Sequence, residues 1–134
     1  MEMIVNIDVD DLAKAVAFYS HALDLRMARR LFEGSVVELI GASSKIHLLA
    51  KPPGSSASSK GEDLRSYRRH WTPVHLAFVV EDIDSAVMRA LSAGANLEGE
   101  IQAFLWGRIA AFSDPFGHGF CLVQFAGKGY DEVA

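Results

Sequence analysis

The sequence is short of several features that point to particular classes of protein. Its single cysteine, Cys121, excludes an intramolecular disulfide and fits a reducing compartment. No hydrophobic run approaches the roughly 20 residues of a membrane-spanning helix, and Met1–Asn6 lacks the basic start of a secretory signal. The formal net charge of -4 argues against nucleic acid, whose binding surfaces are usually strongly basic. We therefore expect a cytoplasmic protein that binds neither nucleic acid nor a membrane.

What is present suffices for one folded domain. The chain has 134 residues, of which 50% are hydrophobic and 22% charged, and domains of ~100–150 residues bury roughly two-thirds of their unfolded surface. Alternating β-branched residues predict a strand at Met3–Val9, and apolar residues at helical spacing predict a helix over Leu12–Leu23, capped by Asp10 or Asp11. Further strands are predicted at Met27–Phe32, Ser35–Ile40 and Lys45–Ala50.

A second set of elements follows a break rich in proline, glycine and serine at Pro52–Lys60, which favours a flexible linker or lid. We predict a strand at Val74–Val80, a helix from Glu81 or Asp82 to Gly94, and strands near Gln102–Leu105, Arg108–Phe112 and Gly119–Phe125. Asp114-Pro115-Phe116-Gly117 has the signature of a type I turn, and the tail is expected to fray. If their region is helical, Arg65, Arg68 and Arg69 form a basic stripe along it. His70 and Trp71 are candidates to cover a binding cleft.

The two halves match at an offset of 71 residues, with His75 lying over Ile4. Four positions are identical: Val9/Val80, Asp11/Asp82, Ala15/Ala86 and Val16/Val87. The order of strand, acidic cap, helix and strands also occurs twice, which predicts a module at 1–51, a linker or lid at 52–73, a module at 74–126 and a tail at 127–134. The expected fold class is α+β, with two paired βαβββ modules forming a curved mixed sheet around a cleft.

These features together resemble the vicinal oxygen chelate superfamily, which includes glyoxalase I, extradiol dioxygenases, fosfomycin-resistance enzymes and bleomycin-resistance proteins. The resemblance covers Met3 to Phe125 and rests on three segments. They are the paired strand–Asp–helix segments ending in Asp11 and Asp82, the helix stretch Ala15–Tyr19, and Trp106–His118 with its Asp-Pro-x-Gly hairpin. The resemblance implies a homodimer and a small-molecule ligand held in a cleft built from two modules.

Metal-using members of this superfamily place one ligand in each of four strands, at positions that correspond here to Ile4, His47, His75 and Cys121. Ile4 cannot bind a metal, and Cys121 replaces the glutamate that serves as ligand and base, so glyoxalase I activity is not expected. Two imidazoles and a thiolate are nevertheless a suitable set of three ligands for zinc. The resemblance thus implies a divalent metal, zinc, at His47, His75 and Cys121, or no metal, with Cys121 an inert buried thiol.

Four further residues are candidates for binding a substrate. Phe104, Trp106 and Arg108 precede the hairpin where relatives line the cleft, and such side chains stack on or neutralise planar or anionic ligands, or else pack at a dimer seam. Asn6 offers a polar contact, or faces water. A nucleophilic pair of Cys121 with a histidine is an alternative that requires a depressed thiol pKa.

Three functions follow from this reading. The first is a metal-assisted enzyme of lyase, isomerase or dioxygenase type with a divergent site. The second is a metal-free protein that sequesters a drug or metabolite, as bleomycin-resistance proteins do. The third is a subunit with a vestigial cleft that associates with a partner.

Overall fold

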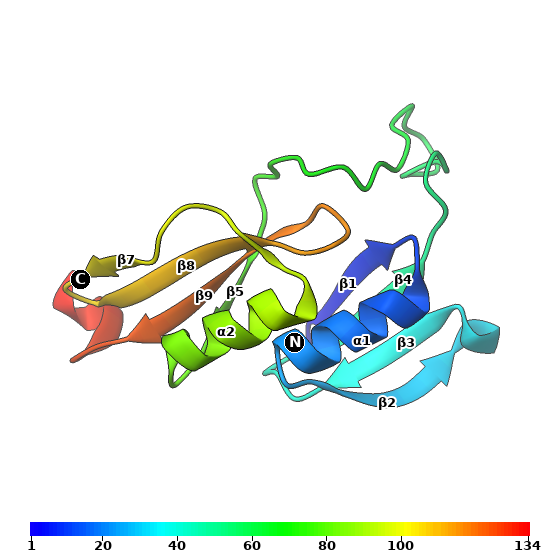
Figure 1. Cartoon of the computed structure of the whole chain (residues 1–134). Coiled ribbons are helices and arrows are strands. Elements are labelled where there is room, and N and C mark those ends of the chain that lie inside the picture. The colour runs from blue at the N-terminus through cyan, green and yellow to red at the C-terminus, as the bar shows by residue number, and fades with distance from the viewer. The chain divides into compact units, whose positions relative to one another are not determined.

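The computed structural model describes residues 1–134, which form two compact units, Met1–Arg68 and Arg69–Ala134. Each unit has its own mixed sheet and its own helix (Figure 1). The boundary between the units falls inside the segment predicted as a linker or lid. No helix in the chain has the length and apolar character needed to cross a membrane.

The first unit is a four-stranded sheet with helix α1 on one face. Its elements are β1 (Ile4–Val9), α1 (Leu12–Ala22), β2 (Arg26–Leu31), the short 3-10 turn η1 (Phe32–Gly34), β3 (Val36–Ile40) and β4 (Lys45–Ala50). The strand order is β1-β4-β3-β2, with β1 parallel to β4 and the other pairs antiparallel. The Asp11 carboxylate accepts a hydrogen bond from the Lys14 amide at 3.0 Å, which confirms Asp11 as the helix cap.

The core of this unit lies between α1 and the sheet. Ile7, Val37 and Leu48 stand level with one another on adjacent strands and are buried, as are Phe18 and Tyr19 of α1. Burying an apolar side chain of this size stabilises the fold by about 1.5–3 kcal/mol. Because side chains alternate along a strand, the neighbouring positions face away from α1.

The segment after β4 folds back onto the first unit. Arg65 Nε donates to Asp8 Oδ2 at 2.7 Å, and the Tyr67 hydroxyl donates to the Lys51 carbonyl at 2.7 Å. Residues 61–69 contain no helix, so the predicted basic stripe does not form. The side chain of Arg65 instead ties this segment to β1.

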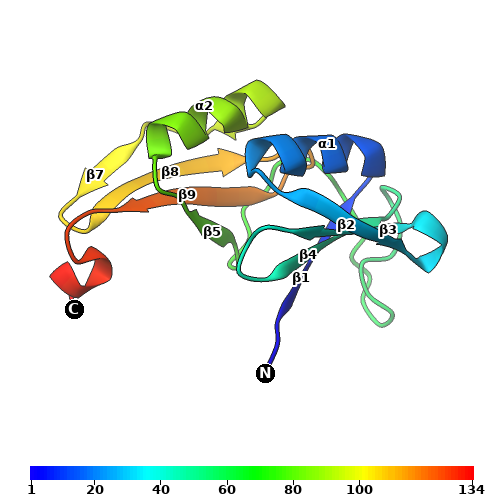
Figure 2. The same ribbon diagram turned by 90° about the horizontal axis from the view of Figure 1, so that it is seen from below.

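The second unit repeats the strand–helix–strand arrangement of the first. Its elements are β5 (Leu76–Val79), α2 (Ile83–Ala93), β6 (Asn96–Leu97), β7 (Gln102–Phe104), β8 (Gly107–Ser113), β9 (Gly119–Phe125) and the 3-10 helix η2 (Gly129–Glu132). The sheet order is β5-β9-β8-β6, β7 also pairs with β8, and Figure 2 shows α2 lying over β8 and β9. The α+β fold class with paired modules is confirmed.

Two local predictions are confirmed in this unit. Gly94 ends α2 with a left-handed φ of 109°. In the β8–β9 hairpin, Asp114 Oδ1 accepts from the amides of Phe116 and His118 at 2.8 and 2.9 Å, and Gly117 closes the turn with a φ of 84°. The two-residue strand β6 was not predicted, and the tail expected to fray contains η2.

Candidate functional site

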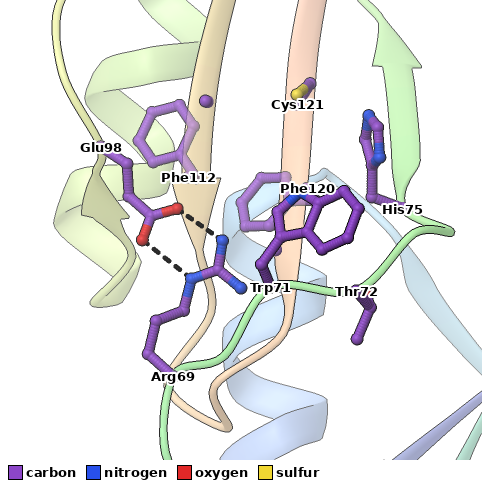
Figure 3. Close-up of a pocket in the computed structure, with 10 residues that line it drawn as sticks. Arg69, Trp71, Thr72, His75, Glu98, Phe112, Phe120 and Cys121 are labelled. Atoms are coloured by element: carbon purple, nitrogen blue, oxygen red, sulfur yellow. Dashed lines mark hydrogen bonds and ion pairs between the residues drawn. The ribbon is translucent and has the colours of Figure 1, made fainter.

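A pocket of about 210 Å³ lies on the second unit (Figure 3). Its floor includes Ala111, Gly119 and Cys121, which share one face of β8 and β9 because Ala111 pairs with Cys121 and Gly119 lies two residues before it. These are small side chains, so the sheet surface is hollow at this level. Phe112 and Phe120, whose rings stack with centroids 5.4 Å apart, also line the pocket.

One rim of the pocket is a bidentate ion pair between Arg69 and Glu98. Arg69 Nε and Nη2 donate to the two Glu98 carboxylate oxygens at 2.8 and 2.7 Å, drawn as dashed lines in Figure 3. A Cβ added to Gly119 would lie 2.8 Å from Arg69 Nη2, so the guanidinium rests directly on β9. The hydrogen bonds from Arg69 hold the pKa of Glu98 below its usual range. The rim therefore carries two charges that compensate each other.

The opposite rim comes from the segment that leads into β5. Trp71, Thr72 and His75 line the pocket, with the Trp71 ring on the near side in Figure 3. The Trp71 side chain is unusually open, with 76% of its surface exposed. A large exposed ring at the mouth of a pocket provides apolar area that a ligand can cover.

Cys121 is half-buried in this pocket. Burial, and secondarily the charge of Glu98, raise the pKa of its thiol. The thiol is therefore protonated at neutral pH, and the thiolate that a nucleophile or a zinc ligand must supply is disfavoured. The alternative of a nucleophilic cysteine–histidine pair required the opposite shift.

The first unit carries a row of polar side chains at one level of its sheet. Arg29, Glu38, His47 and Asn6 are direct neighbours across β2, β3, β4 and β1. Glu38 is buried and accepts from Arg29 Nε at 2.9 Å and Arg29 Nη2 at 3.3 Å, while His47 Nε2 lies 3.0 Å from Glu38 Oε2. Hydrogen bonds from Arg29 and then His47 lower the pKa of Glu38 to about 2.

The predicted zinc ligands are divided between the two units. His75 and Cys121 line the pocket of the second unit, whereas His47 belongs to the first and contacts Glu38. In neither unit do three or more His, Cys, Asp or Glu side chains gather as a metal site would require. Glu98, the carboxylate that lines this pocket, accepts hydrogen bonds from Arg69 at both of its oxygens. Within either unit alone the donors do not fit a resident metal, and the set that joins His47 with His75 and Cys121 stays a prediction.

The other predicted ligand contacts have partners of their own. Arg108 donates to the Asp84 carboxylate at 2.9 and 3.2 Å and to Gln124 at 3.4 Å, on the side of the sheet that faces α2. Phe104 and Trp106 stack with centroids 5.2 Å apart, and Trp106 contacts Tyr130 of η2 at 5.0 Å. Their role in ligand binding stays a prediction, as does that of Asn6.

The sequence analysis did not single out Glu38 or Glu98, and it placed Arg69 in a basic stripe. The sequence did indicate Glu38, because it is the one charged residue in the apolar strand Val36–Ile40. It gave no such indication of Glu98 and Arg69, since they lie in irregular segments 29 residues apart.

The fold and this arrangement define a protein of the paired βαβββ class, and comparison with known proteins supports that assignment. A model of the glyoxalase-like domain matches residues 4–123, and the chain belongs to that family. The chain is 33% identical over 119 residues to the uncharacterized protein Mb0911c of Mycobacterium bovis, covering 87% of this chain and 78% of that protein.

Two solved structures show the same fold at low sequence identity. The fosfomycin resistance protein FosX of Listeria monocytogenes superposes with a TM-score of 0.71 at 20% identity, covering 99% of this chain and 94% of FosX. TnmS3, an antibiotic binding protein of Streptomyces sp. CB03234, superposes with a TM-score of 0.65 at 24% identity, covering 94% and 96% of the two chains.

Proposed function

We propose that this protein binds a small, neutral, planar organic molecule in the pocket of the second unit, without a resident metal. The observation that carries the proposal is the hollow over Ala111, Gly119 and Cys121 beside the exposed ring of Trp71. Ligand pockets are typically apolar with a few polar groups, and an apolar cavity of about 150 Å³ already holds benzene. A pocket of about 210 Å³ suits a molecule of one or two rings.

The charges in the pocket favour a neutral ligand. Arg69 is satisfied by Glu98, and the Cys121 thiol is protonated, so the pocket offers no unpaired charge to an ionic group. Thr72 and His75 remain as polar side chains that can orient a ligand. The family relation supports a binding role, since FosX and TnmS3 are named for resistance to and binding of antibiotics.

Fluorescence of Trp71 tests the proposal directly. In a Trp106→Phe variant, Trp71 is the sole tryptophan, and neutral one- and two-ring compounds should quench or shift its emission in a saturable way. Ala111→Leu fills the hollow and should weaken binding at least tenfold. The matched control is Ala103→Leu, which adds the same atoms at an exposed position of β7. Lack of saturable binding across the panel, or equal binding by Ala111→Leu, would refute the proposal.

Metal-assisted catalysis is the second candidate. In its favour, two of the three predicted zinc ligands, His75 and Cys121, line one pocket. Against it stand the raised pKa of the thiol and the contact of His47 with Glu38. Elemental analysis of protein purified without a histidine tag separates the two candidates.

We also propose that the chain forms a homodimer, as the family resemblance implies. β1 and β5 are edge strands of their sheets, and Ile4 and Val79 expose 47% and 62% of their surfaces there. Edge strands with exposed apolar side chains favour association. Light scattering at several protein concentrations should give twice the monomer mass, and a monomer throughout would refute this.

A further inference from the structure

The segment that leads into β5 supplies much of the pocket wall, although it has no regular secondary structure. Residues 69–75 (the strap) contain no helix or strand, and every residue among them is exposed. Arg69, Trp71, Thr72 and His75 of the strap line the pocket. Because the strap buries none of its side chains in the core, specific contacts must fix its position.

Trp71 has no polar or aromatic partner that would hold its ring at the pocket. The indole makes no hydrogen bond and no ring contact in the structure, and 76% of the surface of Trp71 is exposed. The backbone on either side must therefore determine where the ring lies. On the C-terminal side, Thr72 Oγ1 donates to the Val74 carbonyl at 2.8 Å, which fixes the chain there.

On the N-terminal side of Trp71, the Arg69 guanidinium uses all three of its nitrogens. Nε and Nη2 donate to the Glu98 carboxylate at 2.8 and 2.7 Å (Figure 3). Nη1 donates to the carbonyl of His70, the residue directly before Trp71, and to the Gly117 carbonyl at 3.5 Å. One side chain therefore connects the peptide next to Trp71 with Glu98.

The groups that hold this guanidinium belong to the second sheet. The Glu98 amide donates to the Ala111 carbonyl of β8 at 2.8 Å, so the carboxylate is attached to a strand of the pocket floor. Gly119 of β9 leaves room for the guanidinium, since an added Cβ would lie 2.8 Å from Arg69 Nη2. A bidentate pair of this kind fixes direction as well as distance. The strap is thus attached to the sheet just before Trp71.

We infer that Arg69 and Glu98 are positioning residues, which hold the strap so that Trp71 is pre-oriented for a ligand of the pocket. This inference rests on the function proposed above, because Trp71 supplies apolar area to that pocket. Ordering a loose side chain on binding costs part of the binding free energy, and the ion pair removes that cost in advance. Breaking the pair leaves Trp71 in the chain but frees it to move, which weakens binding.

The motion of Trp71 tests the inference without any ligand. In the Trp106→Phe background, the nanosecond decay of fluorescence anisotropy reports on Trp71 alone. Glu98→Gln should increase the amplitude of the fast decay. Gly119→Ala should do the same although both charged residues remain, because its Cβ displaces the guanidinium. An unchanged decay in Glu98→Gln would overturn the inference.

Asp84→Asn is the matched control for Glu98→Gln. It removes a carboxylate from the other bidentate arginine pair of the second unit, in which Arg108 donates to Asp84 at 2.9 and 3.2 Å. Neither residue of that pair lines the pocket. The decay of Trp71 should therefore match that of the unsubstituted background, and an increase equal to that in Glu98→Gln would overturn the inference.

Coumarin, a neutral molecule of two fused rings, tests the consequence for binding. Glu98→Gln should bind it about threefold more weakly, in keeping with the loss of an exposed ion pair. Arg69→Gln should weaken binding similarly, and the double variant no further, since the second substitution has no pair left to break. Additive losses, or wild-type affinity in Glu98→Gln, would overturn the inference. Lack of coumarin binding by the wild type would count against the proposed function, whereas the positioning of Trp71 stands or falls with its anisotropy.

Discussion

The two units share a strand order but present different side chains at the same level of the sheet. In the first unit the parallel pair is Asn6 and His47, followed by Glu38. In the second unit the corresponding parallel pair is Ala77 and Cys121, followed by Ala111. One scaffold thus supports a continuous polar row in one module and a row of small, weakly polar residues in the other.

This difference shows how a duplicated fold can present two kinds of sheet surface. A buried carboxylate such as Glu38 is tolerated only with partners, and here Arg29 and His47 supply them from adjacent strands. In the second unit the small side chains of Ala111 and Cys121 leave space above the same kind of sheet, and Arg69 and Trp71 line that space. Strand pairing determines the level of a residue, and side-chain size determines whether that level is filled.

The largest expected effect comes from moving the charge of the first unit into the second. Ala111→Glu places a carboxylate where Glu38 stands in the first unit, but next to Cys121 and Glu98 and without a free cation. We expect the free energy of unfolding, measured in denaturant, to be about 1–3 kcal/mol lower than that of the wild type, because the substitution buries a polar group without a partner. Binding of any ligand in the pocket should be lost.

Ala111→Leu is the control for that substitution. It fills the same volume without a charge, so binding should weaken, and the free energy of unfolding should fall less than in Ala111→Glu because no charged group loses its water. If Ala111→Glu were as stable as the wild type, the two rows would not differ in the way proposed, and Arg69 would be the first partner to examine.

The next effect concerns the acid stability of the first unit. The pKa of Glu38 is lowered from 4.5 to about 2, so between these pH values the unfolded state binds more protons than the native state. The contribution of Glu38 is therefore present above pH 4.5 and is lost as the pH falls toward 2. Glu38→Gln should lower the melting temperature at pH 7, and this difference should shrink as the pH approaches 2.

Circular dichroism melts between pH 2 and pH 7 measure this convergence. Glu62→Gln, a change at an exposed position outside the sheets, serves as the control and should leave the pH profile of the wild type unaltered. Parallel profiles for Glu38→Gln and the wild type across this range would contradict the assigned role of Glu38.

Much of the fold followed from local patterns, because alternation, caps and turn residues act over a few positions. Lys45–Ala50 was predicted with the observed bounds, and the Asp114–Gly117 turn was recognised from its residue types. The two-residue strand β6 is too short to produce a periodic signal. η2 depends on Tyr130 meeting Trp106 and Phe125, a tertiary contact that composition does not reveal.

The candidate site was harder to predict because it depends on register. Shifting a strand by one residue moves every side chain to the other face, so the pairing of Glu38 with His47 is not visible in either strand alone. Arg108 illustrates the same limit. Its pairing with Gln124 turns it toward α2 and the Asp84 carboxylate.

A smaller effect is expected at the aromatic cluster near the end of the second sheet. Tyr130→Ala removes ring contacts with Trp106 and Phe125, whose centroids lie 5.0 and 4.8 Å away. We expect a loss of about 0.5–1.5 kcal/mol in the free energy of unfolding, measured in urea. Tyr130→Phe, which keeps the ring, should behave as the wild type. A loss of ligand affinity above twofold in Tyr130→Ala would show that the cluster supports the pocket.

The smallest effect expected is that of zinc, and it tests both units at once. A metal that binds the native state at 100 times its dissociation constant stabilises it by about 2.7 kcal/mol. Because His47 is paired with Glu38 and the Cys121 thiol is held protonated, added zinc should leave the melting temperature unchanged, and purified protein should hold less than about a tenth of an equivalent. His75→Ala and Cys121→Ser should behave alike in this assay. A stoichiometric metal that either substitution removes would show that His75 and Cys121 bind a metal in the second unit and would contradict the metal-free pocket proposed for it.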